Sequence, residues 1–256
     1  MIESAHNRLI KDIKALADKK NRDREGLFIA DGARFVSEIP ENVKIVKMIF
    51  SESYAEKNDI DGYFKKAECA VISDRLFSSL SDTKNPQGIM AVCKKMKSDI
   101  KNIIKKNGFY IIAEEMNDPG NLGTVIRTAH AAGADGVILS KGSVDLYNQK
   151  VLRSTMGSVF KIPIITEAGL EDVCALMKKS GIKIYAAHLR GKKYPYDLDL
   201  KKGCAFMLGN EARGLSDRAS QLCDELVRIP MPGRAESLNA SVAAAVLMYE
   251  TVRQRL

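Results

Sequence analysis

Residues 109–254 alternate between short apolar runs and longer segments in which apolar residues recur at helical spacing. Short apolar runs bounded by turn residues are typical of buried strands, and a repeat of about 3.6 residues is typical of helices. We expect strands at 109–116, 136–140, 162–166, 183–188, 204–208 and 225–229. We expect helices at 121–132, 150–156, 170–180, 217–223 and 238–254. This order predicts a mostly parallel sheet with helices on both faces.

The first part of the chain has shorter elements. A helical pattern near 7–20 precedes apolar strand patterns, with helical patterns between them, at 27–30, 43–50, 70–72 and 88–92. These predict a small α/β domain. Lysines crowd into residues 93–108, where the apolar spacing changes. We therefore place a first domain at 1–96, a linker at 97–107 and a second domain at 108–256.

Length and composition agree with two ordinary globular domains. The chain has 256 residues, of which 45% are hydrophobic, so each domain can bury its own core. No apolar run is long enough to cross a membrane. The amino-terminal segment mixes acids with lysines and lacks an apolar signal core, so we expect a cytoplasmic protein.

The cysteines and histidines do not suggest a metal site. The five cysteines contain no C-x-x-C pair, and the three histidines lack the H-x-x-x-H spacing of a helical zinc site. We expect free, mostly buried thiols and no bound metal.

The net charge of +8 favours a polyanionic partner such as RNA, although many soluble proteins are simply basic. One basic set lies near the amino terminus: Arg8, Lys11, Lys14, Lys19, Lys20, Arg22 and Arg24. It fits either a phosphate-binding face or a solvated helix face, and both interpretations stay open here.

Three turns that follow predicted strands could carry chemistry, because ligands of parallel sheets bind at the carboxyl ends of the strands. The first turn, 117–120, leads into a helix that carries Asn121 and Arg127. The two residues are six apart and therefore angularly offset, so both would need the start of that helix to lie near the substrate. The structural alternative is that Asn121 caps the helix and Arg127 pairs with an acid.

The second turn begins at Gly209, directly after an apolar strand. Gly209 permits close approach of the backbone to a ligand, and Gly214 permits a positive φ. Glu211 could accept a hydrogen bond from a hydroxyl group or neutralise a cation. Its structural alternative is a capping acid in a tight turn.

The third turn interrupts a strand with two prolines, after which Ser237 is expected to begin the last helix. The alanines of this helix allow close packing. Asn239, expected in the first helical turn, is polar where an apolar residue would suffice, so it requires a partner.

These stretches resemble the SpoU (TrmH-type) branch of the SPOUT RNA methyltransferases. Residues 117–129, with the core N-L-G-T-V-I-R, resemble its first motif, 209–214 resemble G-x-E-x-x-G, and 229–241 resemble I-P-M-x-G-x-x-x-S-L-N-x-S. The segment NQKVLRSTMG resembles N-x-K-x-x-R-x-S-x-G. In the first domain, GLFIADGARFVSE and TKNPQGIMAV are similar to the family's substrate-binding domain, with Asp31 where glutamate is commoner.

The resemblance implies an α/β trefoil-knot (SPOUT) methyltransferase domain after a smaller α/β, ribosomal-protein-like RNA-binding domain. It further implies that S-adenosylmethionine is the cofactor and that the protein forms a homodimer through the knotted domain. The residues implied to bind the cofactor are Leu208, Gly209, Ile229, Met231 and Leu238.

The family's activity is methyl transfer to a ribose 2′-hydroxyl, which restricts the substrate to RNA. Arg127 is implied at the centre of the reaction; since guanidinium stays protonated, we assign it an electrostatic role first, with a role as base left open. Glu211 would orient Arg127 or Asn121, Asn121 would brace the arginine, and Ser237 and Asn239 would bind the cofactor or the nucleotide.

The additional first domain favours ribosomal RNA as the substrate, with transfer RNA as the alternative. A non-catalytic RNA-binding protein that retains the knot is a second alternative, against which the intact motif residues argue. An open Rossmann methyltransferase would need G-x-G-x-x-G after an early strand, and a P-loop hydrolase G-x-x-x-x-G-K-[ST]; the chain has neither motif.

Overall fold

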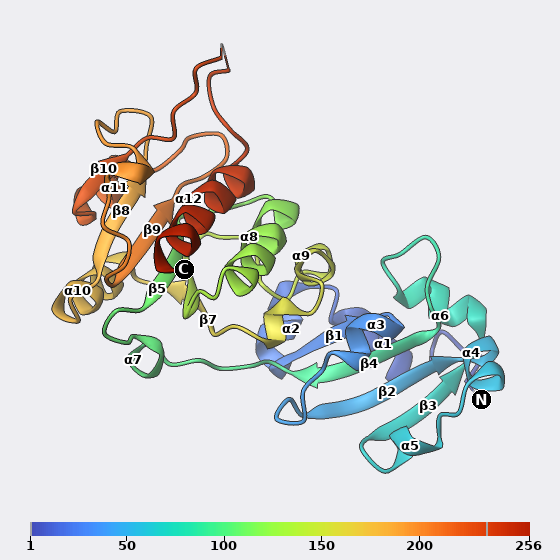
Figure 1. The fold of residues 1–256 in the computed structure, drawn as a ribbon. Helices are drawn as coiled ribbons and strands as arrows, with labels where there is room; N and C mark the ends of the chain where they lie inside the picture. The colour runs from blue at the N-terminus through green and yellow to red at the C-terminus, as the bar shows by residue number, and fades with distance from the viewer. Residues whose placement is uncertain (1, 234) are drawn as a thin grey trace. The chain divides into compact units, whose positions relative to one another are not determined.

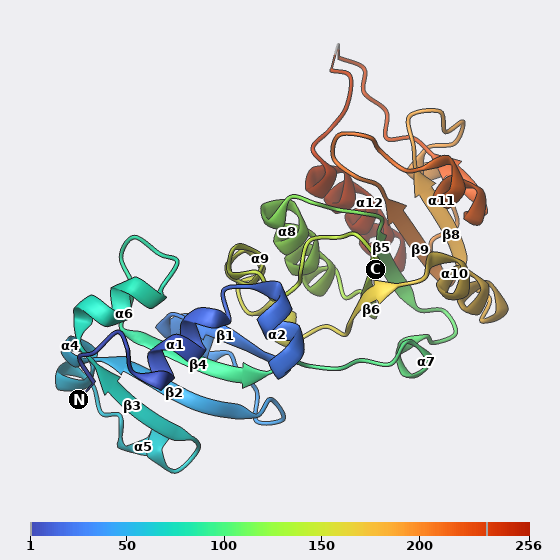
Figure 2. The same ribbon diagram turned by 180° about the vertical axis from the view of Figure 1, so that it is seen from behind.

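The computed structural model describes residues 2–233 and 235–256, and the chain divides into two compact units (Figures 1 and 2). The first unit comprises the chain up to Met96 together with Tyr147–Arg153. The second comprises Lys97–Leu146 and Ser154–Leu256. Arg234, within the third motif, lies outside the described residues.

The first unit contains a mixed four-stranded sheet in the order β1-β4-β2-β3. Strand β4 runs antiparallel to β1 and β2, whereas β2 and β3 are parallel. The strands are β1 (Leu27–Asp31), β2 (Ile45–Ser51), β3 (Glu68–Ile72) and β4 (Ile89–Lys94). The helices are α1 (Arg8–Ala15), α2 (Lys19–Glu25), α3 (Ala33–Ser37), α4 (Glu52–Lys57), α5 (Asp61–Phe64) and α6 (Asp74–Leu80).

The prediction of a single helix near 7–20 is wrong, because the chain forms two helices there. The second helix begins after Asp18, whose side chain accepts a hydrogen bond from the Lys20 N–H and so caps that helix. Arg22 then turns inward, with only 5% of its surface exposed, and donates to the carbonyl oxygens of Leu16 and Ala17. Arg22 is therefore a buried structural residue and not part of a basic surface.

The second unit contains six parallel strands in the order β10-β8-β9-β5-β6-β7. The strands are β5 (Phe109–Ala113), β6 (Gly136–Ser140), β7 (Ile164–Ala168), β8 (Lys183–Ala187), β9 (Cys204–Leu208) and β10 (Glu225–Val227). Every residue of β5 and β9 is buried, as expected for central parallel strands covered on both faces. The predicted parallel sheet is confirmed, although β5 and β10 end earlier than expected.

Helices cover both faces of this sheet. The helices of this unit are α7 (Ile100–Ile103), α8 (Pro119–Ala131), α10 (Leu170–Lys179), α11 (Asp217–Leu222) and α12 (Ala240–Arg255), whereas α9 (Gln149–Thr155) lies mostly in the segment grouped with the first unit. Helices α8 and α12 lie side by side, and α12 also contacts β9 (Figures 1 and 2). Helices α10 and α11 cover the other face of the sheet. They pack on side chains such as Tyr110 and Ile112, which alternate along the strand with the side chains that face α12.

All five cysteines are free, and three of them, Cys93, Cys174 and Cys204, are buried as expected. Burial raises the pKa of the Cys93 thiol to about 12. No helix in the described part of the chain is long and apolar enough to span a membrane.

Candidate functional site

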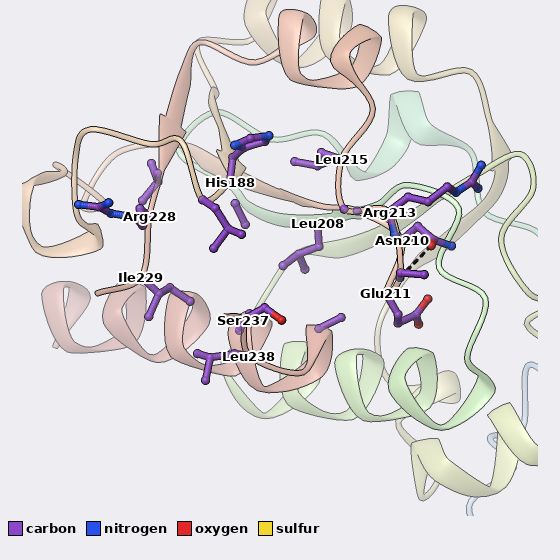
Figure 3. A pocket seen from close by; sticks show the side chains of 18 of the residues that line it. His188, Leu208, Asn210, Glu211, Arg213, Leu215, Arg228, Ile229, Ser237 and Leu238 are labelled. Atoms are coloured by element: carbon purple, nitrogen blue, oxygen red, sulfur yellow. Dashed lines mark hydrogen bonds between the residues drawn. The ribbon is translucent and has the colours of Figure 1, made fainter. Parts of the chain in front are cut away.

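A cavity of about 390 Å³ opens where β8, β9 and β10 end in the second unit (Figure 3). It lies at the carboxyl edge of the parallel sheet, where ligands of such sheets bind. The five residues expected to hold the cofactor all line it: Leu208, Gly209, Ile229, Met231 and Leu238. They come from the end of β9, the segment after β10 and the segment before α12, so the fold brings these two late motifs together.

The loop after β9 folds back on itself because of two glycines. Asn210 and Gly214 exchange backbone hydrogen bonds of 3.1 and 2.8 Å. A side chain at Gly209 would collide with the backbone of Gly214 and Leu215. Gly209 is therefore required by the chain's own backbone at this turn. Gly214 has the expected positive φ, of 70°.

Glu211 ties this loop to the start of α8. Its carboxylate accepts hydrogen bonds from the N–H groups of Asn117 and Asp118, each at 3.1 Å, and from the Asn121 side chain at 3.2 Å. In Figure 3 its carboxylate points toward α8. Partial burial raises the pKa of Glu211, but the hydrogen bonds outweigh this effect, and its pKa lies below the usual value. Glu211 is thus held as an anion at neutral pH.

Asn121 continues the connection to the last helix. Its side-chain oxygen accepts a hydrogen bond of 2.9 Å from the Asn239 amide. Asn239 is the N-cap of α12, with its oxygen accepting from the N–H groups of Ser241 and Val242. The helix therefore begins two residues later than expected, and Asn239 precedes its first turn. Asn121 does not cap α8, since Asp118 holds that position.

Arg127 stands apart from this network. It lies on the exposed side of α8, and within residues 2–233 and 235–256 its side chain forms no hydrogen bond or ion pair. Neither Asn121 nor Glu211 braces it, and the alternative in which an acid pairs with it does not occur among these residues. Ser237 lines the cavity at an exposed position (Figure 3).

Two adjacent carboxylates after β5 brace the same region and escaped the sequence reasoning. Arg213 forms an ion pair of 2.6 Å with Glu115, whose carbonyl oxygen accepts from the Asn210 side chain at 2.8 Å. Glu115 has a positive φ of 46°, uncommon for a residue other than glycine. Glu114 is nearly buried and accepts from the Ser216 N–H and hydroxyl. Two adjacent glutamates near the end of a predicted strand are the sequence feature that could have indicated these residues.

The end of β8 also contributes to the cavity, through His188 and Leu189. The His188 Nδ1 atom accepts a hydrogen bond from the Arg190 N–H, and burial, with the charge of Arg190, lowers its pKa. Arg228, which follows the neighbouring strand β10, also lines the cavity and donates to the Tyr194 hydroxyl at 3.1 Å. Sequence reasoning missed these residues, although the carboxyl end of a predicted parallel strand marks such positions.

The family model described as the SpoU rRNA Methylase family matches residues 108–249. The chain belongs to this family. A second family model, the MRM3-like substrate binding domain, matches residues 7–91. The family expected from the three motifs is thereby confirmed.

Relatives in this family match along nearly the whole chain. The 23S rRNA (guanosine(2553)-2'-O)-methyltransferase RlmP of Bacillus subtilis (strain 168) is 35% identical over 249 residues, which are 97% of this chain and 97% of that protein. The 23S rRNA (uridine(2479)-2'-O)-methyltransferase of Streptomyces viridochromogenes is 30% identical, over 94% of this chain and 88% of that protein.

Solved structures agree with the fold. An AdoMet-bound rRNA methyltransferase from Sinorhizobium meliloti superposes with a TM-score of 0.89 at 32% identity, covering 100% of this chain and 98% of that one. The SpoU methyltransferase AviRb from Streptomyces viridochromogenes, in complex with AdoMet, gives a TM-score of 0.88 at 27% identity over 98% of both chains. The expected fold class, an α/β SPOUT domain with a smaller α/β domain, is confirmed.

Proposed function

We propose that this protein transfers a methyl group from S-adenosylmethionine to a ribose 2′-hydroxyl of 23S ribosomal RNA. The observation that carries the proposal is that the second and third motifs line one cavity, and that Asn121 of the first motif joins Glu211 and Asn239 in a continuous hydrogen-bonded chain. Relatives that match along nearly the whole chain are named 23S rRNA 2'-O-methyltransferases, which supports the same substrate class.

The cavity fits the proposed cofactor in size and chemistry. Its volume of about 390 Å³ lies in the range of small-molecule sites, about 300–1,000 Å³. Leu208, Ile229 and Leu238 provide apolar walls for an adenine ring, and the turn at Gly209 exposes backbone groups for its polar edges. When bound, S-adenosylmethionine supplies a methyl group activated on a sulfonium. The residues of the chain must then position the ribose oxygen and favour the charge that develops on it.

We assign these tasks to five residues. Arg127, unpaired among the described residues, would contact the target phosphate and stabilise the developing alkoxide. Glu211 and Asn121 would hold the loop before α8, and Asn239 would hold the start of α12. Ser237, which lines the cavity, would hydrogen-bond the cofactor or the nucleotide. In this assignment Arg127 and Ser237 act on the bound molecules, while the other three residues build the site.

The two family models support separate roles for the two domains. Residues 1–96 are proposed to bind the RNA substrate and 108–256 to carry out the transfer, with 97–107 as the linker; the models match 7–91 and 108–249. Because the proposed substrate is ribosomal RNA, we propose that the protein works in the cytoplasm. We also propose that it needs no metal ion.

The last helix supports the proposed homodimer. Val242, Val246 and Tyr249 are 49%, 36% and 53% exposed, and their spacing places them on one face of α12. Exposed apolar stripes of this kind mark protein interfaces. A second copy of the chain has the same stripe, so packing two copies about a two-fold axis next to α12 would bury both stripes.

The test is methyl transfer from labelled S-adenosylmethionine to ribosomal RNA isolated from cells that lack the protein. Transfer to a single ribose of 23S rRNA, absent in RNA from cells that contain the protein, is expected. Labelling of transfer RNA alone would assign the alternative substrate. Cofactor binding without transfer to either RNA would indicate a non-catalytic RNA-binding protein.

A further inference from the structure

A second cavity, of about 510 Å³, lies entirely within the first unit. It opens where β2 leads into α4, beside the start of α6 and the loop before β4. Helices α4 and α6 lie close together at this end of the sheet (Figures 1 and 2), and the Ser53 hydroxyl donates a short hydrogen bond to Asp74. The TKNPQG stretch, singled out in the sequence, supplies one wall through Lys84, Asn85 and Gln87.

The lining chemistry differs from that of the methyltransferase cavity. Lys57 and Lys84 are exposed and form no ion pair with any described residue. The side chains of Asn58, Asn85 and Gln87 add amide donors and acceptors. Lysine ammonium groups suit phosphates, and amides suit the hydrogen-bonding edges of unpaired bases.

Tyr54 adds an aromatic group to the cavity. Its ring stacks on Phe50, with the ring centroids 6.0 Å apart, which fixes the ring on the core of the unit. The Tyr54 hydroxyl has no hydrogen-bond partner among residues 2–233 and 235–256. Burial raises its pKa, so the hydroxyl stays protonated and can donate at neutral pH.

The loop that carries Lys84, Asn85 and Gln87 is held in place before any ligand arrives. The Gln87 side-chain oxygen accepts from the Ala33 N–H at 2.7 Å, which leaves its NH₂ group for another partner. Gly88 has a φ of 80°, and a Cβ atom there would lie 2.7 Å from both the Ser51 hydroxyl and the Tyr54 Cβ. A preorganised loop loses little conformational entropy on binding.

We propose that this cavity binds an unpaired nucleotide of the RNA substrate, with Lys84 and Lys57 at its phosphates and Asn85 and Gln87 at its base. The identity of the RNA rests on the proposed function. Asp74 is the one carboxylate among the described lining residues, and it already accepts a hydrogen bond from the Ser53 hydroxyl. The site is therefore not built to bind a cation.

The test uses the full-length protein with Lys84→Ala and Asn85→Ala, separately and combined. The control is Lys66→Ala, an exposed lysine of the same unit outside the cavity. We expect the KM for a 23S rRNA fragment to rise by about tenfold in the double variant, with kcat and cofactor affinity unchanged. Lys84→Ala should reduce the salt slope of RNA binding by about one. Asn85→Ala should weaken binding of the substrate RNA but not of an unrelated single strand.

Direct RNA binding, followed by fluorescence anisotropy, separates this proposal from the proposed function. If the wild-type protein transfers no methyl group but the variants still weaken RNA binding, the methyltransferase assignment fails and the nucleotide site stands. If transfer occurs and all variants behave like Lys66→Ala, the nucleotide site is wrong.

Discussion

Asn239 donates a hydrogen bond from its side-chain amide to the Asn121 side-chain oxygen, across 118 residues of sequence. The direction of this bond is fixed at both ends. The backbone N–H groups of α12 can only donate to Asn239, and the Glu211 carboxylate can only accept from Asn121. The start of α12 and the loop after β9 are thereby connected through one asparagine of α8.

Glu211→Gln should loosen this connection. The amide NH₂ group of glutamine would face backbone donors at Asn117 or Asp118, so one hydrogen bond would become a contact between two donors. We expect lower cofactor affinity and a lower thermal midpoint at pH 7. Because the pKa of Glu211 is lowered in the folded protein, the stability it contributes is present above its unfolded pKa of about 4.3 and is lost as the pH falls through the folded pKa.

Thermal unfolding of the wild type and Glu211→Gln between pH 3 and pH 8 would measure this effect. The difference between the two midpoints should be largest near neutral pH and should close in acid. A difference that stays constant with pH would show that the Glu211 charge does not contribute.

Arg127→Ala should abolish methyl transfer while leaving cofactor affinity nearly unchanged. The side chain is exposed and forms no hydrogen bond or ion pair with the described residues, so its loss should change the free energy of unfolding by no more than about 0.5 kcal/mol. Single-turnover transfer and calorimetric titration with S-adenosylmethionine check the two quantities. Thr124→Ala, at another exposed position on α8, is the control. Unchanged turnover would remove Arg127 from the mechanism.

Short-range patterns explain what could be predicted from the sequence and what could not. Strands β6 and β9 match their expected bounds because apolar runs of central parallel strands are continuous. The pairing of Asn121 with Asn239 and Glu211 depends on three segments meeting in space, so the motifs brought these residues together without revealing their partners. The inward turn of Arg22 was missed because a basic residue in a charged run usually stays in solvent.

Gly209→Ala should damage the cofactor cavity. Any Cβ atom there would overlap the Gly214–Leu215 backbone, so the loop must move. We expect cofactor affinity to fall by about tenfold or more, equivalent to about 1.4 kcal/mol. Gly62→Ala, in the first unit, is the matched control, because a Cβ atom at Gly62 meets nothing within 4 Å. Equal affinities for both variants would mean that the loop adapts without cost.

Arg22→Ala should act on stability. The buried guanidinium satisfies the carbonyl oxygens of Leu16 and Ala17, and its removal leaves them unpaired at a cost of about 1–3 kcal/mol. Lys20→Ala, on the exposed side of the same helix, should leave stability unchanged. Urea denaturation followed by circular dichroism compares the two variants. Equal midpoints would contradict the structural role of Arg22.

Val246→Asp should separate the proposed dimer into monomers. A carboxylate in the middle of the Val242, Val246 and Tyr249 stripe would be buried without a partner in a two-fold interface, and such burial costs several kcal/mol. Light scattering after size-exclusion chromatography should give the dimer mass for the wild type and the monomer mass for the variant. Phe64→Ser, which removes a similarly exposed aromatic ring from the first unit, should stay dimeric. A dimeric Val246→Asp protein would place the interface on another surface, and a monomeric wild type would exclude the homodimer.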